Sequence, residues 1–336
     1  MSGKSGLQGR LLALVVFPSL TALAVSMLFG RFKSAGMDLE LRAHCQPASP
    51  LPTPYLIQYT GLSALDKALC PLVTFFHNIM DSPTSLSFLT YAIGIGAPLI
   101  LLPLLEAYRT GRRNLMAYPV IWGLLTQIAT VAIIIPIYWL VFILVEGSQK
   151  SRSLSIRSFA QAEAEAIVFG VIIGAVIPSV AMLTMTDAYL TAIWQIYPAI
   201  VSIGQLLHLQ FRPVSLHPQS GYRTMQVLYI ACFVVSSSVH ISTVWPLFNN
   251  FAAIKMLLLP SASPLHPSNG LNLHLLDFLK WDVIIAYSAT ALAMLWFTKN
   301  MKQVLTVLLW YSVAIPIFGF GAAVMGVAIW RDGVLD

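Results

Sequence analysis

Three carboxylic acid residues lie within or at the ends of apolar segments of this chain: Glu106, Asp187 and Asp282. A carboxyl group inside a bilayer is costly and rare, so it indicates function by default. An apolar environment also favours the protonated form of a carboxyl group, which is the form that a general acid needs. These three residues are therefore the candidate catalytic acids.

Each acid also has an ordinary structural interpretation. Glu106 ends an apolar segment three residues before Arg109, so the two side chains can form an interfacial ion pair. Asp187 fits the N-cap of the helix that follows it. Asp282 follows Trp281 at the expected start of a span, where the helix dipole favours an acid. The sequence leaves open which acid donates a proton.

Aromatic and polar side chains near these acids are candidates for the lining of a pocket. Aromatic faces stabilise cations electrostatically without capturing them. Aromatic residues also fill ordinary membrane helices, and the one histidine at membrane depth also fits a structural hydrogen bond. The candidate substrate-binding residues are Tyr91, Trp122, Tyr138, Trp139, Trp194, Tyr197, Arg109 and His240.

Several familiar reaction centres have no counterpart in the sequence. There is no phosphate-binding loop motif, no complete dinucleotide fingerprint and no serine nucleophile elbow. Neither the histidines nor the cysteines have the spacing of metal ligands, and no aspartate-rich cluster is present to bind a magnesium diphosphate. We therefore expect no metal and no organic cofactor, and isolated acids, hydroxyls and aromatic rings carry the chemistry.

The composition shows what kind of molecule must position these groups. Hydrophobic residues make up 57% of the 336 positions and charged residues only 10%, whereas soluble domains contain about 25% charged residues. So few charges cannot cover a surface that faces water, so most of the chain must face lipid. The formal charge of +6 lies mostly in loops, and no basic run outside the apolar segments indicates nucleic acid.

Apolar segments of the length that crosses a bilayer recur along the whole sequence. Because barrel-like alternation is absent, these segments must be helices. We therefore predict an all-α membrane bundle of about eight transmembrane helices, forming one domain over residues 1–336. Residues 30–82 are expected outside the membrane, with an interfacial helix over 65–80. The predicted spans are 11–29, 86–106, 119–145, 167–185, 188–207, 225–247, 281–297 and 304–330.

The loops give conflicting information about orientation. The basic loop that begins at Arg109 favours the cytoplasm, which agrees with a cytoplasmic N-terminus and eight spans. The same count, however, places the basic residues near 212–223 and 299–302 on the opposite side. Cys45 and Cys70 flank the long polar loop and can form a disulfide if that loop is luminal.

Four loose patterns give the chain a family resemblance. It resembles the fungal membrane-bound terpene cyclases of the ascofuranone and ascochlorin type, which act in meroterpenoid pathways. The patterns that carry the resemblance extend over most of the chain: Leu65-Asp66-x-x-Leu69-Cys70 followed by Phe75-Phe76 and Asp81; Pro103-x-x-Glu106-x-x-Arg109; Asp187 before Trp194-Gln195-x-Tyr197-Pro198; and Trp281-Asp282.

The resemblance implies a concrete reaction. Such enzymes take a lipid-like phenolic meroterpenoid that bears a farnesyl chain with a terminal epoxide. A membrane acid protonates the epoxide, the olefins attack in sequence, and proton loss or an oxygen nucleophile ends the cascade. The resemblance implies no metal or cofactor, no obligate protein partner, and a place in the endoplasmic reticulum membrane.

Other functions use similar parts. A carrier or channel for an apolar metabolite would suit the proline-broken segments at Pro136 and Pro316. A sterol-isomerase-like enzyme would also use membrane acids and aromatic rings, and a receptor-like protein would have no chemistry. A cyclase is expected to bring the three acids together at one closed, aromatic-lined cavity, whereas a carrier is expected to have a polar path to both sides.

Overall fold

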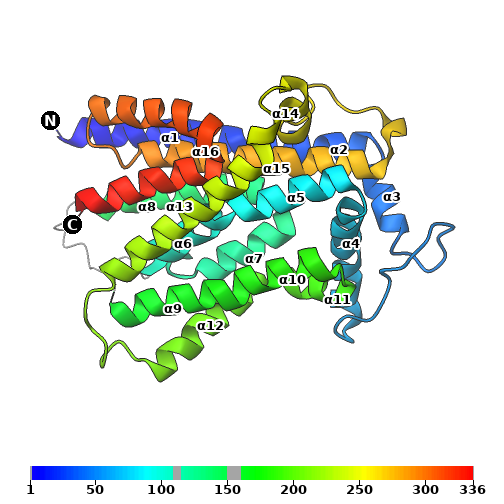
Figure 1. Cartoon of the computed structure of the whole chain (residues 1–336), viewed down its shortest axis with the longest axis horizontal. Helices are drawn as coiled ribbons and strands as arrows, with labels where there is room; N and C mark the ends of the chain where they lie inside the picture. The colour runs from blue at the N-terminus through cyan, green and yellow to red at the C-terminus, as the bar shows by residue number, and fades with distance from the viewer. Residues whose placement is uncertain (1, 109–114, 150–159, 336) are drawn as a thin grey trace.

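The computed structural model describes residues 2–108, 115–149 and 160–335. Every regular element in these ranges is a helix, which confirms the predicted fold class. Six helical segments are long and apolar enough to cross a membrane, and the bent pair α11 (Ala188–Trp194) and α12 (Tyr197–Phe211) is a seventh candidate. Most of the helices run roughly along the long axis of Figure 1, so this axis corresponds to the membrane normal.

The six long segments are continuous apolar stretches built from one or more consecutive helices. They are Gln8–Ser34, from α1 (Ser2–Val25), η1 (Ser26–Gly30) and α2 (Arg31–Ser34); Pro83–Tyr108, from α5 (Pro83–Ile95) and α6 (Ala97–Tyr108); Gln161–Met185, from α9 (Gln161–Val171), η3 (Ile172–Val176) and α10 (Ile177–Met185); Tyr222–Leu247, mainly α13 (Tyr222–Val244); Pro267–Leu295, mainly α15 (Gly270–Leu295); and Met301–Gly333, within α16 (Met301–Leu335).

The expected third span, 119–145, is two helices instead of one. α7 (Pro119–Ala129) ends where Thr130 has a φ of 74°, and α8 (Val131–Gln149) begins directly after it. The rings of Trp122 and Tyr138 lie 5.3 Å apart, although sixteen residues of straight helix would separate them by about 24 Å. The chain therefore enters the bundle along α7 and returns along α8 as a hairpin (Figure 1).

The expected eighth span is also folded back on itself. Gly319, with a φ of 84°, breaks the helical backbone of α16. The indole N–H of Trp310 donates to the carbonyl of Ala323 at 2.8 Å, a contact that thirteen residues of straight helix would place about 20 Å away. A side chain at 319 would also meet the ring of His240. Both ends of α16 consequently lie at the same end of the molecule, beside the N-terminus (Figure 1).

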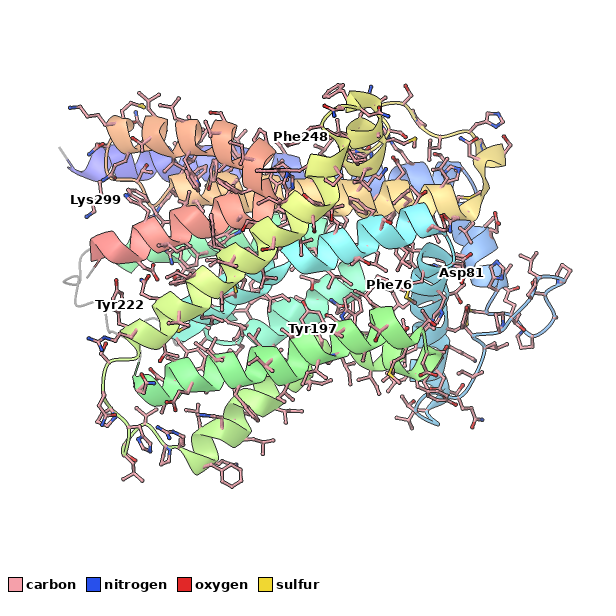
Figure 2. The ribbon with its side chains drawn as sticks, viewed as in Figure 1. Phe76, Asp81, Tyr197, Tyr222, Phe248 and Lys299 are labelled. Atoms are coloured by element: carbon pink, nitrogen blue, oxygen red, sulfur yellow. A yellow bond between two sulfur atoms is a disulfide. The ribbon has the colours of Figure 1, made fainter. Side chains whose placement is uncertain are left out.

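The two hairpins resolve the conflict over orientation. Lys299 and Tyr222 lie at the end of the molecule that carries both termini, and Asp81 lies at the other (Figure 2). The basic positions Arg212, Arg223 and Lys302 flank helix ends at the terminal end of the molecule. The positive-inside tendency favours the cytoplasm for this end, and we call it the cytoplasmic end.

The opposite end is closed by the polar segment that follows the first span. α3 (Met37–Ala43) leads into an extended loop, and α4 (Ser63–Met80) then lies across the direction of the spans, as expected of an interfacial helix (Figure 1). A disulfide joins Cys45 to Cys70, with the Cα atoms 5.9 Å apart. Because disulfides persist in oxidising compartments, the bond agrees with a non-cytoplasmic position for this end.

Close helix packing depends on a few glycines. The Gly170-x-x-x-Gly174 motif of the fourth predicted span faces α12, where a Cβ atom at Gly174 would lie 2.3 Å from the backbone nitrogen of Val201. Contact this close is possible only without side chains, which is the usual use of small residues in membrane helix pairs.

Candidate active site

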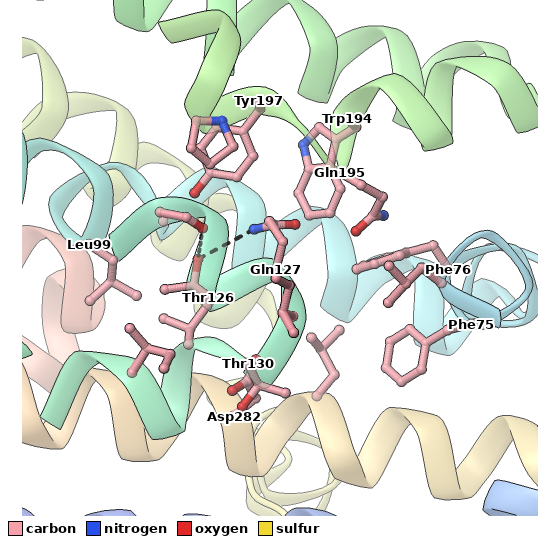
Figure 3. Close-up of a pocket in the computed structure, with 18 of the residues that line it drawn as sticks. Phe75, Phe76, Leu99, Thr126, Gln127, Thr130, Trp194, Gln195, Tyr197 and Asp282 are labelled. Carbon is pink, nitrogen blue, oxygen red and sulfur yellow. Dashed lines mark hydrogen bonds between the residues drawn. The ribbon is translucent and has the colours of Figure 1, made fainter. Parts of the chain in front are cut away.

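A cavity of about 910 Å³ lies between the disulfide-bonded end and the middle of the bundle. Its wall comes from α3, α4, α5, α6, both limbs of the α7–α8 hairpin, α11, α12 and α15. Ligand pockets usually measure about 300–1,000 Å³, so this one is large enough for a sizeable organic molecule. Most lining residues are apolar, and the polar side chains of its inner part include Thr126, Gln127, Thr130, Gln195 and Asp282 (Figure 3).

Asp282 is the candidate acid that lines this cavity. It lies near the middle of α15 instead of at the start of the span, because the helix already begins at Gly270. Sequence hydropathy placed the start of the span too late, since the first half of α15 carries polar residues that are satisfied by α14 (Phe251–Leu258) and the loop after it. Lys280, for example, donates to the carbonyl of Met256 at 2.5 Å, and Asp277 accepts from the backbone of Ser261.

The carboxyl group of Asp282 is bound to the tip of the α7–α8 hairpin. Its Oδ1 accepts a hydrogen bond from the backbone N–H of Ala132 at 2.7 Å. The first N–H groups of a helix have no partner within the helix, and a buried helix start needs one from elsewhere. Asp282 supplies that partner from 150 positions further along the chain. The side chain is only 8% exposed and lies beside Thr130 at the cavity wall (Figure 3).

Aromatic rings form a continuous wall along the cavity. Phe278, one helical turn before Asp282, packs against Phe75 with ring centroids 5.6 Å apart. Phe75 contacts Phe76, and Phe76 contacts Trp194 at 4.9 Å. The wall then continues to Tyr197, 5.8 Å from Trp194. Of the candidate binding residues, Trp122, Tyr138, Trp194 and Tyr197 line this cavity.

The remaining candidate binding residues lie elsewhere. His240 accepts from the Tyr91 hydroxyl at Nδ1 (2.9 Å) and donates from Nε2 to the carbonyl of Pro316 (3.2 Å), next to the break in α16. Trp139 donates to Thr290 at 3.2 Å. The side chains of Tyr91, Trp139 and His240 therefore form hydrogen bonds between helices and do not line the cavity. Arg109 lies outside the described residues.

Glu106 is buried in an ion-pair cluster near the cytoplasmic end. Its carboxylate lies 2.7 Å from the guanidinium of Arg331, and the two side chains are 2% and 4% exposed. Arg331 also reaches Asp332 at 3.2 Å, and Asp332 accepts a hydrogen bond from Tyr229. The guanidinium further stacks on Phe297, 4.4 Å from the ring centroid. Glu106 therefore has a strong cationic partner and does not line the cavity.

Asp187 caps a helix at the opposite end. Its side chain accepts from the backbone N–H of Leu190 at 3.0 Å and is exposed. The expectation that the three candidate acids meet at one cavity is therefore wrong, since only Asp282 among them lines the aromatic cavity. Within the residues that the structure describes, no group of three or more His, Cys, Asp or Glu side chains is arranged to hold a metal ion.

Comparison with known proteins gives the family of this chain. Residues 12–335 match the CtvD domain. The chain belongs to the CtvD domain family. A protein named terpene cyclase ascI, from Acremonium egyptiacum, is 28% identical over 206 residues, which cover 57% of this chain and 53% of that protein. The chain thus spans about half the length of this curated relative. No solved structure matches. The family resemblance stated from the sequence is confirmed.

Sequence reasoning missed several lining residues of this CtvD domain. Thr126, Gln127 and Thr130 line the tip of the hairpin, and Gln195 lies across the cavity from them (Figure 3). Their signal was present, because three hydrogen-bonding side chains within five positions interrupt an otherwise apolar stretch. Such a cluster is typical of a helix that breaks inside the membrane, where a polar cavity satisfies the backbone.

The disulfide-bonded end of this CtvD domain contains groups that are held in place by hydrogen bonds. Asp66 accepts from the backbone of Tyr59 and from the backbone and hydroxyl of Thr60. Although partial desolvation opposes the effect, these hydrogen bonds lower the pKa of Asp66. Burial lowers the pKa of His77, which stacks on Tyr55. Asp66 therefore anchors the loop that precedes α4.

Proposed function

We propose that this protein is a membrane-bound cyclase that opens a terminal epoxide on a prenyl chain, with Asp282 as the proton donor. The observation that carries the proposal is the placement of one buried carboxyl group on the wall of a large aromatic cavity in the middle of a span. The printed name of the relative from Acremonium egyptiacum, a terpene cyclase, supports the same class of reaction.

The proposed reaction begins with proton transfer. The O–H of the protonated Asp282 carboxyl group gives its proton to the epoxide oxygen, and the carbon–oxygen bond at the more substituted carbon breaks. The nearest alkene attacks that carbon, which forms a ring bond and moves the positive charge along the prenyl chain. Loss of a proton, or attack by a hydroxyl group of the substrate with loss of its proton, ends the cascade. Substrate and product therefore have the same composition.

Two features of the site support this use of Asp282. An apolar site favours the protonated carboxyl group, and the N–H of Ala132 fixes one oxygen so that the other can point at the substrate. The rings of Phe75, Phe76 and Trp194 present faces and edges along the path of a developing cation. A wall with few polar groups also keeps water away from the cation.

The proposed substrate is a lipid-like phenol that bears an epoxidised farnesyl chain, dissolved in the surrounding membrane lipid. The proposed location is the endoplasmic reticulum membrane. The Cys45–Cys70 disulfide supports a membrane with one oxidising side.

Product analysis with acid variants tests the proposal. Microsomes that contain the wild-type chain are incubated with an epoxyfarnesyl phenol, beside Asp282→Asn, Asp187→Asn and Glu106→Gln variants at matched levels of inserted protein. We expect cyclised product from wild type and Asp187→Asn, and a rate at least about 10²-fold lower from Asp282→Asn. Conversion by Asp282→Asn at the wild-type rate would refute its role as proton donor. If wild type converts no member of a panel of such epoxides, the cyclase proposal fails, and transport of the same compounds becomes the hypothesis to test.

A further inference from the structure

The cavity has a second, chemically different end. The inner part around Asp282 is lined by apolar and uncharged polar side chains, whereas the outer part near the disulfide is lined by Arg42, Lys67 and Asp38. The side chains of Arg42 and Lys67 are exposed, and in the described part of the chain neither forms an ion pair. With one carboxylate and two cations, the outer end carries a net positive charge.

The disulfide holds the two cations together. Arg42 lies three residues before Cys45, and Lys67 three residues before Cys70, so each is about one helical turn from a bridged cysteine. The bridge keeps the Cα atoms of the cysteines 5.9 Å apart, and Cys45 itself lines the cavity. The covalent link therefore fixes two basic side chains from different helices at one opening.

A continuous apolar path connects these cations to the acid. Lys67, Pro71 and Phe75 follow one another at intervals of four residues along one face of α4, and all three line the cavity. Phe75 contacts Phe278, which lies one turn before Asp282 on α15. A molecule that follows this path has one end beside Lys67 and the other beside Asp282.

We infer that the substrate is an amphiphile with a negatively charged head group, such as a carboxylate or an acidic phenol, which Arg42 and Lys67 bind while the tail extends to Asp282. This inference rests on the proposed function of Asp282 only for the position of the tail. Arginine and lysine form charge-assisted hydrogen bonds with anions, and these are about twice as strong as neutral ones. Asp38 lies on the same face of α3 as Arg42 and repels anions. An anion is therefore expected to bind beside the two cations and away from Asp38.

Binding of a probe that cannot react tests the inference independently of catalysis. The probe is a farnesyl-substituted benzoic acid without an epoxide, and its methyl ester is the uncharged control. The purified full chain in phosphatidylcholine nanodiscs is titrated with each compound, and binding is followed by quenching of tryptophan fluorescence. The variants are Arg42→Gln, Lys67→Gln and the double variant. Lys33→Gln, an exposed basic residue of the same end that does not line the cavity, is the matched control.

We expect the double variant to weaken binding of the acid by roughly tenfold or more, and binding of the ester by less than about twofold. Lys33→Gln is expected to change neither. Equal affinity of wild type for acid and ester, or equal weakening of both in the double variant, would overturn the inference.

A second set of nanodiscs separates the substrate from lipid. If the two cations bind anionic lipid head groups instead, adding phosphatidylserine will abolish the preference for the acid in wild type, and this result also overturns the inference. A preference that persists in phosphatidylserine supports it. If an epoxidised acid binds with the expected preference but is not converted, the proposed function fails and the head-group site stands.

Discussion

Two buried acids of this protein are held in opposite ways. Glu106 lies at the cytoplasmic end against the guanidinium of Arg331, 2.7 Å away, in a cluster of charges and an aromatic ring. Asp282 lies near the middle of a span, where it is hydrogen-bonded to the uncharged groups of the α7–α8 hairpin tip and faces the cavity. A carboxylate with a buried cation is stabilised in its charged form, whereas one that faces an apolar cavity can hold a transferable proton. Partner and surroundings, more than depth, distinguish a structural acid from a catalytic one.

The largest expected effect separates the two functions of Asp282. Asp282→Asn keeps an oxygen that can accept from Ala132, whereas Asp282→Leu keeps none. Both variants are expected to lose roughly 10²–10⁴-fold in cyclisation rate, which is the usual contribution of a general acid. Asp282→Leu is expected to lose about 1–3 kcal/mol of unfolding free energy as well, because the N–H of Ala132 is left buried without a partner. Cyclisation rates with purified protein and unfolding in mixed micelles measure both effects, and equal stability of the two variants would contradict the capping function.

The next effect concerns the other acid. Arg331→Met removes the buried guanidinium that lies 2.7 Å from Glu106 and is expected to cost about 3–5 kcal/mol of unfolding free energy. The rate per folded molecule is expected to stay within about threefold of wild type, because the cluster does not line the cavity. Denaturation in mixed micelles measures the first quantity.

The matched control is Arg212→Met, which removes a partly exposed ion pair with Glu165 and is expected to cost less than about 1 kcal/mol. A normal stability combined with a large rate loss for Arg331→Met would reverse the assignment of the two acids.

The third acid provides an intermediate case. Asp187→Ala removes the side-chain cap of α11 and is expected to cost about 1 kcal/mol of unfolding free energy. Asp187→Asn retains a capping oxygen and is expected to cost only about a few tenths of a kcal/mol of unfolding free energy. Neither variant is expected to change the cyclisation rate by more than about threefold. A large rate loss in both would show that Asp187 contributes to the chemistry.

The smallest effect concerns the buried histidine under the loop at the disulfide-bonded end. Burial lowers the pKa of His77 below its ordinary value of 6.5, so the unfolded chain binds a proton at a higher pH than the folded one. Stability is therefore expected to be complete above pH 6.5 and to fall as the pH drops through that value. His77→Gln is expected to reduce this dependence. Unfolding between pH 8 and pH 5 measures it, and a stability that rises towards pH 5 would contradict the lowered pKa.

The sequence was sufficient for the fold class, the interfacial helix and the family, because these depend on hydropathy and on local patterns. The count and course of the spans were less accessible. Residues 119–145 have the hydropathy of one span, and the polar residues Thr126, Gln127 and Thr130 are a weak local sign of the hairpin at Thr130. Gly319 breaks α16 in the same way. Counting each of these hairpins as one crossing put the basic residues on opposite sides.

The functional differences among the acids were inaccessible for another reason. The sequence expected Glu106 to pair with Arg109, which lies outside the described residues, and it gave no sign of the pair with Arg331 that the structure shows. It also expected Asp282 to lie at the start of its own helix, whereas its carboxyl group caps a different helix. Both contacts depend on residues that are distant along the chain. Asp187 is different, because an N-cap depends only on its neighbours in sequence, and the capping interpretation agrees with the structure.

The long separation between α8 and its cap also bears on how the protein is made. Asp282 emerges from the ribosome 150 residues after Ala132, which at usual rates of synthesis is about 8–30 s later. During that interval the tip of the hairpin has no carboxylate to cap it, and the cavity lacks both its acid and the wall that α15 provides. The site is therefore completed only by the last quarter of the chain, and a product truncated before α15 enters the membrane without it.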